Sequence, residues 1–364
     1  MLLWLLACSL SSSPEKGDVK PVLPVDDAPP ITALITIDTW RADHFTEALT
    51  PNLWALAEAG ERYTNAWSPM GLTTPAHASM LTGLLPWEHD VWANNHHGYS
   101  LSDTIPVLPE QYPDRATGAF VSAYPAGPTG GFHRGWDVFD GPGEGERPGG
   151  VTIAKALDWV PSDRPSLLWI HVYEPHGPYV GDGYTEQERY ASEVRKVDQM
   201  MGPVLSFLQA RGATIVVTSD HGEVLAEERC GYQHERSISE TVLRVPLIRW
   251  SPGLVPTVVN DWVGLTDIPA LLRGKSPAQR DHWVAQSGMC ESDCAPGCDP
   301  TGLAGRDTVV FSEGGRWVQR PGKGVYKEGQ PAQKNKKLLE QIPPFVSPMQ
   351  SQTDGAKSLG YIDP

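Results

Sequence analysis

The chain has 364 residues, and its 40% apolar and 20% charged residues exclude an intrinsically disordered protein. Its 29 Lys and Arg residues against 44 Asp and Glu residues give a net charge of −15, which argues against nucleic-acid binding. No apolar run reaches about 18 residues, so we predict no transmembrane helix.

The first eight residues form a short apolar stretch that ends at Cys8. The sequence Leu-Leu-Ala-Cys resembles the lipobox of bacterial lipoproteins, so we predict residues 1–8 to be a signal peptide. Cys8 would then carry a lipid that anchors the protein to a membrane of the cell envelope, at the outer membrane or in the periplasm. A plain secretory signal, which would give a secreted protein, and a wrongly assigned start are the alternatives. Residues 9–27 are polar and contain Pro, which is typical of a flexible tether.

Strands and helices are predicted to alternate from residue 31 onward. Runs rich in β-branched residues predict strands at 31–37, 119–121, 166–172 and 213–218. Helices are predicted from Thr50, from Pro75, and over 184–210, where apolar side chains recur on one side before Gly212. This alternation predicts an α/β fold with a doubly wound, mostly parallel sheet. We expect one large domain over 28–273 and a small cysteine-containing portion over 274–364, where the pattern weakens.

Four cysteines lie beyond Cys8, namely Cys230, Cys290, Cys294 and Cys298. An even number of cysteines outside the cytoplasm predicts two disulfides, and the sequence leaves all three pairings open. A metal site formed by residues 290–298 is the alternative. The spacing of that cluster is not CxxC, however, and no histidine lies close by in the sequence.

Residues able to bind a metal follow three of the predicted strands. Asp38 follows the first strand, His176 follows 166–172, and Asp220 and His221 follow 213–218. The carboxyl ends of parallel strands meet at one edge of a sheet, so we expect these side chains to face one space. Two carboxylates and an imidazole there would form a divalent-cation site. The alternative for each Asp is a turn or helix cap.

A candidate nucleophile lies at the start of the helix around Pro75. Thr73 or Thr74 would sit at its N-terminus, where free backbone N–H groups bind anions. A hydroxyl bound there to a cation loses its proton more easily. A simple Thr N-cap is the alternative interpretation.

Several motifs occur together in one order along residues 31–273. They are Ile37–Asp43, Thr50–Leu53, Thr73–Gly83, Tyr173–Tyr179, Thr218–Glu223 and Arg244–Ile248. With these motifs the chain resembles the sulfatase-like branch of the alkaline phosphatase superfamily. Residues 359–362 also resemble a tail motif of some relatives. The resemblance implies the doubly wound fold and a metal-dependent reaction on an anionic ester.

The resemblance also implies a role for each matching residue. Asp38, Asp220 and His221 would ligate one divalent metal, and Thr73 would be the nucleophile and complete the set of ligands. His77 stands where the sulfatase signature has Arg, and it would steady the nucleophile or the bound anion.

Three further residues match positions close to the substrate. His176 would contact the transferred group or the leaving oxygen, His234 would lie near the substrate, and Asn94 would contact it. A nitrogen ligand favours zinc or manganese over calcium or magnesium. A second metal would require His176 and His234 to approach each other, and the sequence offers no clear third ligand for it.

The nucleophile position departs from that of true sulfatases. Those enzymes oxidise a Cys or Ser to formylglycine, and Thr73 cannot give that aldehyde because its β-carbon carries a methyl group. The paired Asp of sulfatases is Asp38-Thr39 here, and His221 replaces a common Asn. The resulting ligand set resembles that of the phospho-transferring members.

We therefore expect a metal-dependent hydrolase or transferase that acts on phosphodiesters or phosphomonoesters through a phosphothreonine. A sulfuric ester hydrolase without formylglycine is one alternative. A catalytically inactive binding lipoprotein of the envelope is the other. The sequence leaves the substrate's identity and the oligomeric state open.

Overall fold

The computed structural model describes residues 30–94, 99–225, 234–288, 306–320 and 324–342. The predicted signal peptide, tether and lipid anchor lie outside these ranges, as do the tail motif and all five cysteines. The disulfide prediction is therefore not tested. None of the helices in the described ranges combines the length and apolar character needed to cross a bilayer.

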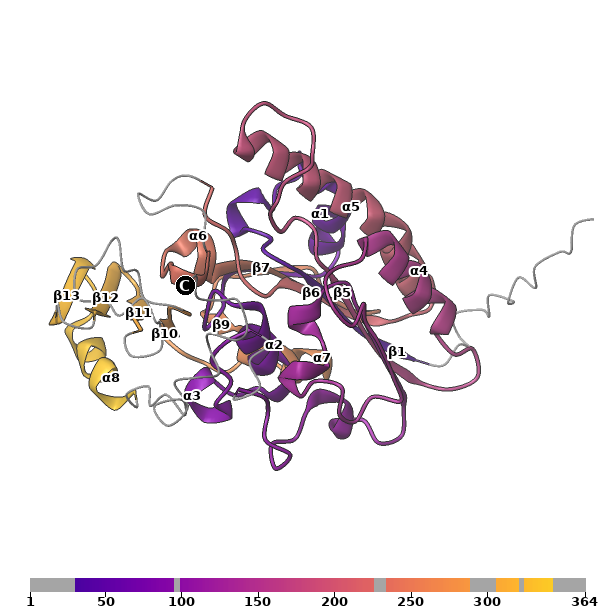
Figure 1. The fold of residues 1–364 in the computed structure, drawn as a ribbon, viewed down its shortest axis with the longest axis horizontal. Helices are drawn as coiled ribbons and strands as arrows, with labels where there is room; N and C mark the ends of the chain where they lie inside the picture. The colour runs from indigo at the N-terminus through magenta and orange to yellow at the C-terminus, as the bar shows by residue number, and fades with distance from the viewer. Residues whose placement is uncertain (1–29, 95–98, 226–233, 289–305, 321–323, 343–364) are drawn as a thin grey trace, which may run out of the picture.

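One nine-stranded sheet forms the centre of the molecule (Figure 1). Its strands run in the order β4 (Val138–Asp140), β3 (Ala116–Val121), β5 (Ser166–Val172), β1 (Ile31–Ile37), β6 (Thr214–Ser219), β7 (Arg244–Trp250), β2 (Glu61–Trp67) and β8 (Thr257–Val259), and β9 (Val263–Gly264) also pairs with β2. The strands from β4 to β6 are mutually parallel, and β7 is antiparallel to both β6 and β2. The predicted α/β fold with a mostly parallel sheet is confirmed.

Helices cover both faces of this sheet (Figure 1). One face packs against α1 (Pro51–Glu58), α4 (Gly149–Trp159) and α5 (Glu186–Ala210), and the other against α2 (Thr73–Thr82) and α7 (Ile268–Leu272), while α3 (Pro86–His89) contacts α2. Along β1, Ile35 faces the first layer and Leu34 faces the second. Successive side chains of a strand point to opposite faces, so a strand covered on both sides is apolar throughout.

The remaining helical elements are short. They are α6 (Glu240–Leu243), α8 (Lys336–Gln341), and the 3-10 helices η1 (Ala42–His44), η2 (Leu108–Gln111), η3 (Tyr124–Ala126), η4 (Pro128–Gly130), η5 (His234–Arg236), η6 (Leu265–Asp267) and η7 (Gln333–Asn335). Several of them lie in the loops that lead into or out of the candidate site.

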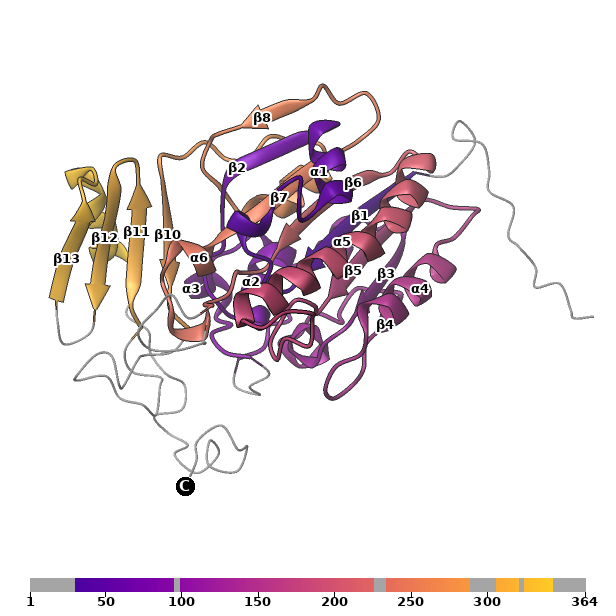
Figure 2. The ribbon, with the colours of Figure 1, turned by 90° about the horizontal axis from the view of Figure 1, so that it is seen from above.

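A second, antiparallel sheet lies beside the first (Figure 2). It contains β10 (His282–Gln286), β11 (Thr308–Ser312), β12 (Gly315–Arg320) and β13 (Gly324–Gly329). Trp283 Nε1 donates a hydrogen bond to the carbonyl oxygen of Ser68 at 2.9 Å, and the Gln286 N–H donates to that of Pro69 at 2.9 Å. The small sheet therefore packs on the segment that leads into α2.

A candidate metal centre and nucleophile

The central strands β1 and β6 place three metal-binding side chains together. Asp38 directly follows β1, and Asp220 and His221 directly follow β6, its parallel neighbour. Their ligand atoms all lie within 4.8 Å of one another, and all three residues are completely buried. Within the described ranges this is the one group of three such residues.

The polar atoms of this group fit a divalent cation. Asp38 Oδ1 and Asp220 Oδ2 are buried without a hydrogen-bond partner, although an unpaired buried carboxylate oxygen is costly. His221 Nδ1 lies 2.9 Å from the carbonyl oxygen of Gly222, so it donates there and leaves Nε2 as an acceptor. His221 Nε2 lies 3.4 Å from Asp220 Oδ2. Burial and the negative charge of the neighbouring Asp220 raise the pKa of Asp38. A bound cation would relieve the repulsion between these two carboxylates.

Three hydrogen bonds hold the tight turn that follows Asp38. Thr39 takes a positive φ of 53°, which is uncommon for a residue with a side chain. Its N–H donates to Asp220 Oδ1 at 3.2 Å, and its carbonyl accepts from the Tyr190 hydroxyl at 2.7 Å. The next N–H, of Trp40, donates to Ser219 Oγ at 2.9 Å. Nothing in the sequence marks Tyr190 and Ser219 for this role, because only their distant partners distinguish them from ordinary polar residues.

Gly222 is required by a close approach of two backbone segments. A β-carbon at this position would lie 2.0 Å from the carbonyl oxygen of Thr241. The Gly222 N–H donates to the carbonyl of Val242 at 2.6 Å. The backbone after His221 is therefore held against α6.

The first turn of α2 brings Thr73 to this centre. Thr73 Oγ1 lies 3.4 Å from Asp38 Oδ2 and 3.5 Å from His221 Nε2. The Thr74 hydroxyl instead donates to the carbonyl of Pro125 at 2.7 Å. Of the two candidate nucleophiles, Thr73 thus contacts the candidate metal ligands and Thr74 does not.

Asn94 lies at the start of α2. Its Oδ1 accepts a hydrogen bond from the Thr74 N–H at 2.9 Å, and the side chain is partly exposed. This position puts the amide next to the nucleophile, where we predicted a contact with substrate.

Two buried histidines lie beneath the carboxylates. His77 Nδ1 lies 2.8 Å from the Thr73 carbonyl and 3.8 Å from Asp220 Oδ2, and His171 Nε2 lies 3.3 Å from Asp38 Oδ2. Burial lowers the pKa of each histidine to about 4, so both are neutral near neutral pH. His171 lies inside the buried strand β5, and its side chain contacts a candidate ligand.

His176 and His234 approach the centre from its outer side. The His234 ring stacks on that of His221 with centroids 4.4 Å apart, and the ring of His176 lies 5.3 Å from that of His234. Burial lowers the pKa of His176 to about 4. Burial would also lower that of His234, but an ion pair with Glu223, Nδ1 to Oε1 at 3.0 Å, raises its pKa to about 9. The two histidines thus differ in charge near neutral pH.

The contacts of His176 and His234 do not favour a second metal site between them. His176 and His234 do approach each other, as such a site would need. His234 Nδ1 is engaged by Glu223, however, and His176 Nδ1 lies 2.7 Å from the carbonyl of Gly177. The described residues provide no second group of three ligands.

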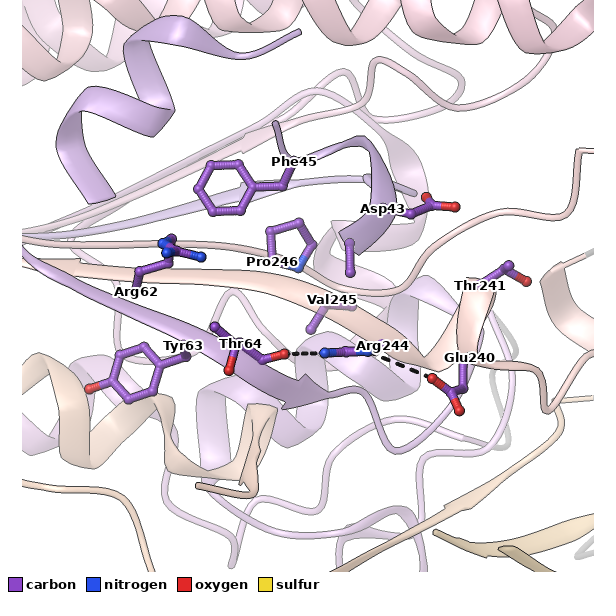
Figure 3. A pocket seen from close by; sticks show the side chains of 11 residues that line it. Asp43, Phe45, Arg62, Tyr63, Thr64, Glu240, Thr241, Arg244, Val245 and Pro246 are labelled. Atoms are coloured by element: carbon purple, nitrogen blue, oxygen red, sulfur yellow. Dashed lines mark hydrogen bonds and ion pairs between the residues drawn. The ribbon is translucent and has the colours of Figure 1, made fainter. Parts of the chain in front are cut away.

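A surface pocket of about 350 Å³ lies apart from this centre (Figure 3). Its wall is formed by η1, β2, α6 and β7, and it contains none of the three candidate ligands. Arg244 donates to the Thr64 carbonyl at 2.5 Å and lies 3.7 Å from Glu240. Groups of the protein itself therefore pair with its charge. The candidate metal centre contains two unpaired buried carboxylate oxygens and this pocket contains none, so we take that centre as the functional site.

Comparison with known families decides the affiliation of the chain. The family described as Sulfatase matches residues 30–272, which include every strand of the large sheet and every candidate site residue. The chain belongs to the sulfatase family. Its fold is that of the alkaline phosphatase superfamily, as the ordered motifs predicted.

Curated relatives of this sulfatase-family chain include two kinds of enzyme. N-acetylgalactosamine-6-sulfatase of Canis lupus familiaris is 24% identical over 280 residues, 57% of this chain and 53% of that protein. An uncharacterized pyrophosphatase/phosphodiesterase of Schizosaccharomyces pombe is 26% identical over 220 residues, 52% of this chain and 44% of that protein. The chain spans about half the length of these relatives.

Solved structures share the fold more completely. The phosphonate monoester hydrolase of Silicibacter pomeroyi superposes with a TM-score of 0.66 at 15% identity, covering 91% of this chain and 97% of that chain. BT1596, a 2-O GAG sulfatase, gives a TM-score of 0.65 at 15% identity, covering 86% and 90%. At this identity the likeness establishes the architecture alone.

Proposed function

We propose that this sulfatase-family protein is a metal-dependent hydrolase or transferase of phosphoesters that works through a covalent intermediate on Thr73. The observation that carries the proposal is the contact of Thr73 Oγ1 with Asp38 and His221, two of the three candidate ligands. Thr73 cannot be oxidised to formylglycine, because its β-carbon carries a methyl group. A phosphodiesterase relative and a phosphonate monoester hydrolase of the same fold support a reaction at phosphorus.

The cation would be held by Asp38, Asp220 and His221, with Thr73 as a further oxygen ligand. When bound, it would neutralise charge on the ester oxygens and lower the pKa of the threonine hydroxyl. The imidazole ligand favours zinc or manganese over calcium or magnesium. We propose a single metal, since the described residues hold one suitable group.

Protein side chains perform the remaining steps. The Thr73 hydroxyl gives its proton to water, Oγ1 attacks phosphorus in line, and the bond from phosphorus to the leaving oxygen breaks. His234, protonated through its ion pair with Glu223, donates a proton to the leaving alkoxide. Water or an acceptor alcohol then attacks phosphorus and gives its proton to His234. The bond from phosphorus to Oγ1 breaks, and Oγ1 takes a proton back from water to restore the Thr73 hydroxyl.

Replacing the nucleophile tests the proposal. We expect T73A to lower kcat on a bis-aryl phosphodiester by about 10³-fold or more, since the covalent route is lost. T82A is the matched control, because Thr82 lies at the other end of α2 and donates to the carbonyl of Ala78. Zinc binding and the unfolding temperature of T73A should stay close to those of the wild type. Undiminished turnover by T73A would show that Thr73 is not the nucleophile.

Metal removal and a substrate panel distinguish the other functions. A chelator should abolish activity, and added zinc or manganese should restore it. An aryl phosphodiester, an aryl phosphate and an aryl sulfate are assayed side by side. Preference for the sulfate would favour a sulfuric ester hydrolase without formylglycine, and an inert protein after reconstitution would favour a binding lipoprotein.

We also propose that the protein is anchored in the cell envelope by a lipid on Cys8. The support is the Leu-Leu-Ala-Cys sequence and the polar tether after it. Fractionation of cells that express the full chain tests this, with C8S as the variant. The wild type should be found with membranes and the variant should not.

A further inference from the structure

Both ring nitrogens of His77 are used inside the protein. Nδ1 lies 2.8 Å from the carbonyl oxygen of Thr73, and Nε2 lies 3.2 Å from the hydroxyl of Thr36 on β1. The residue is completely buried. No nitrogen of His77 is therefore directed at a substrate anion, and of the two roles that the family resemblance implied these contacts favour steadying the nucleophile.

The hydrogen positions in this cluster follow from donor and acceptor chemistry. Trp169 Nε1 lies 3.1 Å from Thr36 Oγ1, and an indole can only donate. At the other end, the carbonyl of Thr73 can only accept, so His77 Nδ1 carries a hydrogen. The one hydrogen of the Thr36 hydroxyl then has His77 Nε2 as its acceptor. All three bonds point the same way, from Trp169 through Thr36 and His77 to Thr73.

We propose that Trp169, Thr36 and His77 form a positioning chain that fixes His77 as the neutral Nδ1–H tautomer and holds the backbone of the nucleophile. His77 is then a positioning residue rather than a cation that binds the substrate anion. An imidazolium at this position would leave the hydroxyl hydrogen of Thr36 without its acceptor. The inference deepens the proposed function and rests on it for the role of Thr73.

These hydrogen bonds connect β1 and α2, the two elements whose relative position sets the geometry of the site. Thr36 lies in β1, two residues before Asp38, and His77 lies one turn after Thr73 in α2. Thr73 Oγ1 and Asp38 Oδ2 are 3.4 Å apart across this junction. A displacement of about 1 Å at such a contact can lower a rate by about 10²-fold. The geometry therefore indicates that His77 keeps Thr73 at the distance from Asp38 that the reaction needs.

Nitrogen NMR of histidine-labelled, zinc-loaded full chain tests the tautomer directly. The His77 signals are assigned by their loss in H77N. We expect Nδ1 to be protonated and Nε2 to be an unprotonated, hydrogen-bonded acceptor. T36V removes the donor to Nε2, so it should move the Nε2 shift toward that of a free acceptor. W169F removes the donor to Thr36 and weakens the next bond only indirectly, so it should move the shift in the same direction by less. Protonation of both nitrogens, hydrogen on Nε2 alone, or unchanged shifts in the two variants would overturn the proposal.

Activity measurements separate positioning from ordinary structure. T36V should lower kcat about 10- to 100-fold with little change in KM, as loss of a supporting partner does. T32V is the matched control, because Thr32 lies on the same strand and its hydroxyl accepts from Arg115 instead. H77N can keep the bond to the Thr73 carbonyl through its amide, so it should retain more activity than H77A. Equal losses in H77N and H77A would contradict the role.

The two proposals fail separately. If the wild type turns over no phosphoester but shows the expected nitrogen signals, the proposed function fails and the hydrogen-bond chain stands. If turnover depends on Thr73 but His77 is doubly protonated, the function stands and this inference fails. The unfolding temperature of T36V shows whether this variant folds. If T36V does not fold, W169F and the wild-type spectrum still test the proposal.

Discussion

The charge of His234 depends mainly on Glu223. Burial disfavours the imidazolium, and the Glu223 carboxylate at 3.0 Å reverses that effect, so the pKa of His234 is about 9. Burial would raise the pKa of Glu223, but His234 lowers it to about 2. The pair therefore stays ionised across the neutral range, with a proton available beside the candidate centre.

The pH profile of E223Q tests this dependence. A raised pKa means that His234 is protonated below about pH 9 and loses its proton as the pH rises through that value. In the wild type, kcat/KM should therefore fall above about pH 9. Without Glu223, burial is opposed by the weaker attraction of Glu235 and Asp38, so the pKa should fall toward its ordinary 6.5 and the limb should move about two pH units toward acid.

The exposed carboxylate of Glu240 provides a control for the change in charge, through E240Q. Its profile should match that of the wild type. A basic limb that is the same in E223Q and the wild type would show that His234 is not the acid whose proton is used.

At the scale of elements, α1 is capped by a residue of another helix. Thr50 occupies its N-cap position, but the Thr50 hydroxyl donates back to the carbonyl of Thr46 and caps nothing. Asp198 of α5 instead accepts from the N–H groups of Asn52 and Leu53 at 3.1 and 2.9 Å. Asp198 is buried, and its partners are N–H groups in the first turn of a neighbouring helix, which have no acceptor within that helix.

Removing this cap should destabilise the fold. We expect D198A to lower the free energy of unfolding by about 2 kcal/mol, because buried N–H groups lose a charged acceptor. Q199A is the matched control, since Gln199 is exposed on the same helix, and it should change stability by less than about 0.5 kcal/mol. Urea unfolding measures both variants. Equal midpoints for the two would argue against an interhelix cap.

At the scale of the whole molecule, the small sheet supports the site. The guanidinium of Arg306 donates to the carbonyls of Ser287 at 3.2 Å and Trp92 at 3.0 Å, and the residue is buried. The Gly288 N–H donates to the Glu235 carbonyl at 2.7 Å, next to His234. The C-terminal residues thus hold segments that border α2 and η5, so the small sheet and the large one form a continuous structure around the site.

Loss of Arg306 should therefore reduce both stability and turnover. R306M keeps an extended side chain but leaves two carbonyls without their charged donor, and we expect a loss of about 2 kcal/mol or more. K327M is the control, because Lys327 is an exposed cation on β13 of the same sheet. Denaturant unfolding and phosphodiester hydrolysis are measured together. A stable, fully active R306M would indicate that the small sheet has no supporting role.

Local signals predicted the parallel half of the sheet well. The strand expected at 166–172 coincides with β5, and the helix expected at 184–210 begins two residues later, at Glu186. No local pattern predicted β2, β4, β7, α4 or the small sheet. Charged residues interrupt β7, a Gly- and Pro-rich loop precedes α4, and the strands β10 and β11 are widely separated in the sequence. Pairing over such distances is set by tertiary packing, which a local pattern does not record.

The sequence by itself determined the family motifs, the placement of Asp38, Asp220 and His221 after strands, and a threonine that cannot become an aldehyde. These properties reside in residue types and short spacings. Only the tertiary structure decided the state of each histidine, because burial and hydrogen-bond partners come from distant segments. His77 is 41 residues from Thr36, and Thr36 is 133 from Trp169. The charge of His234 and the tautomer of His77 therefore emerge only when those segments meet.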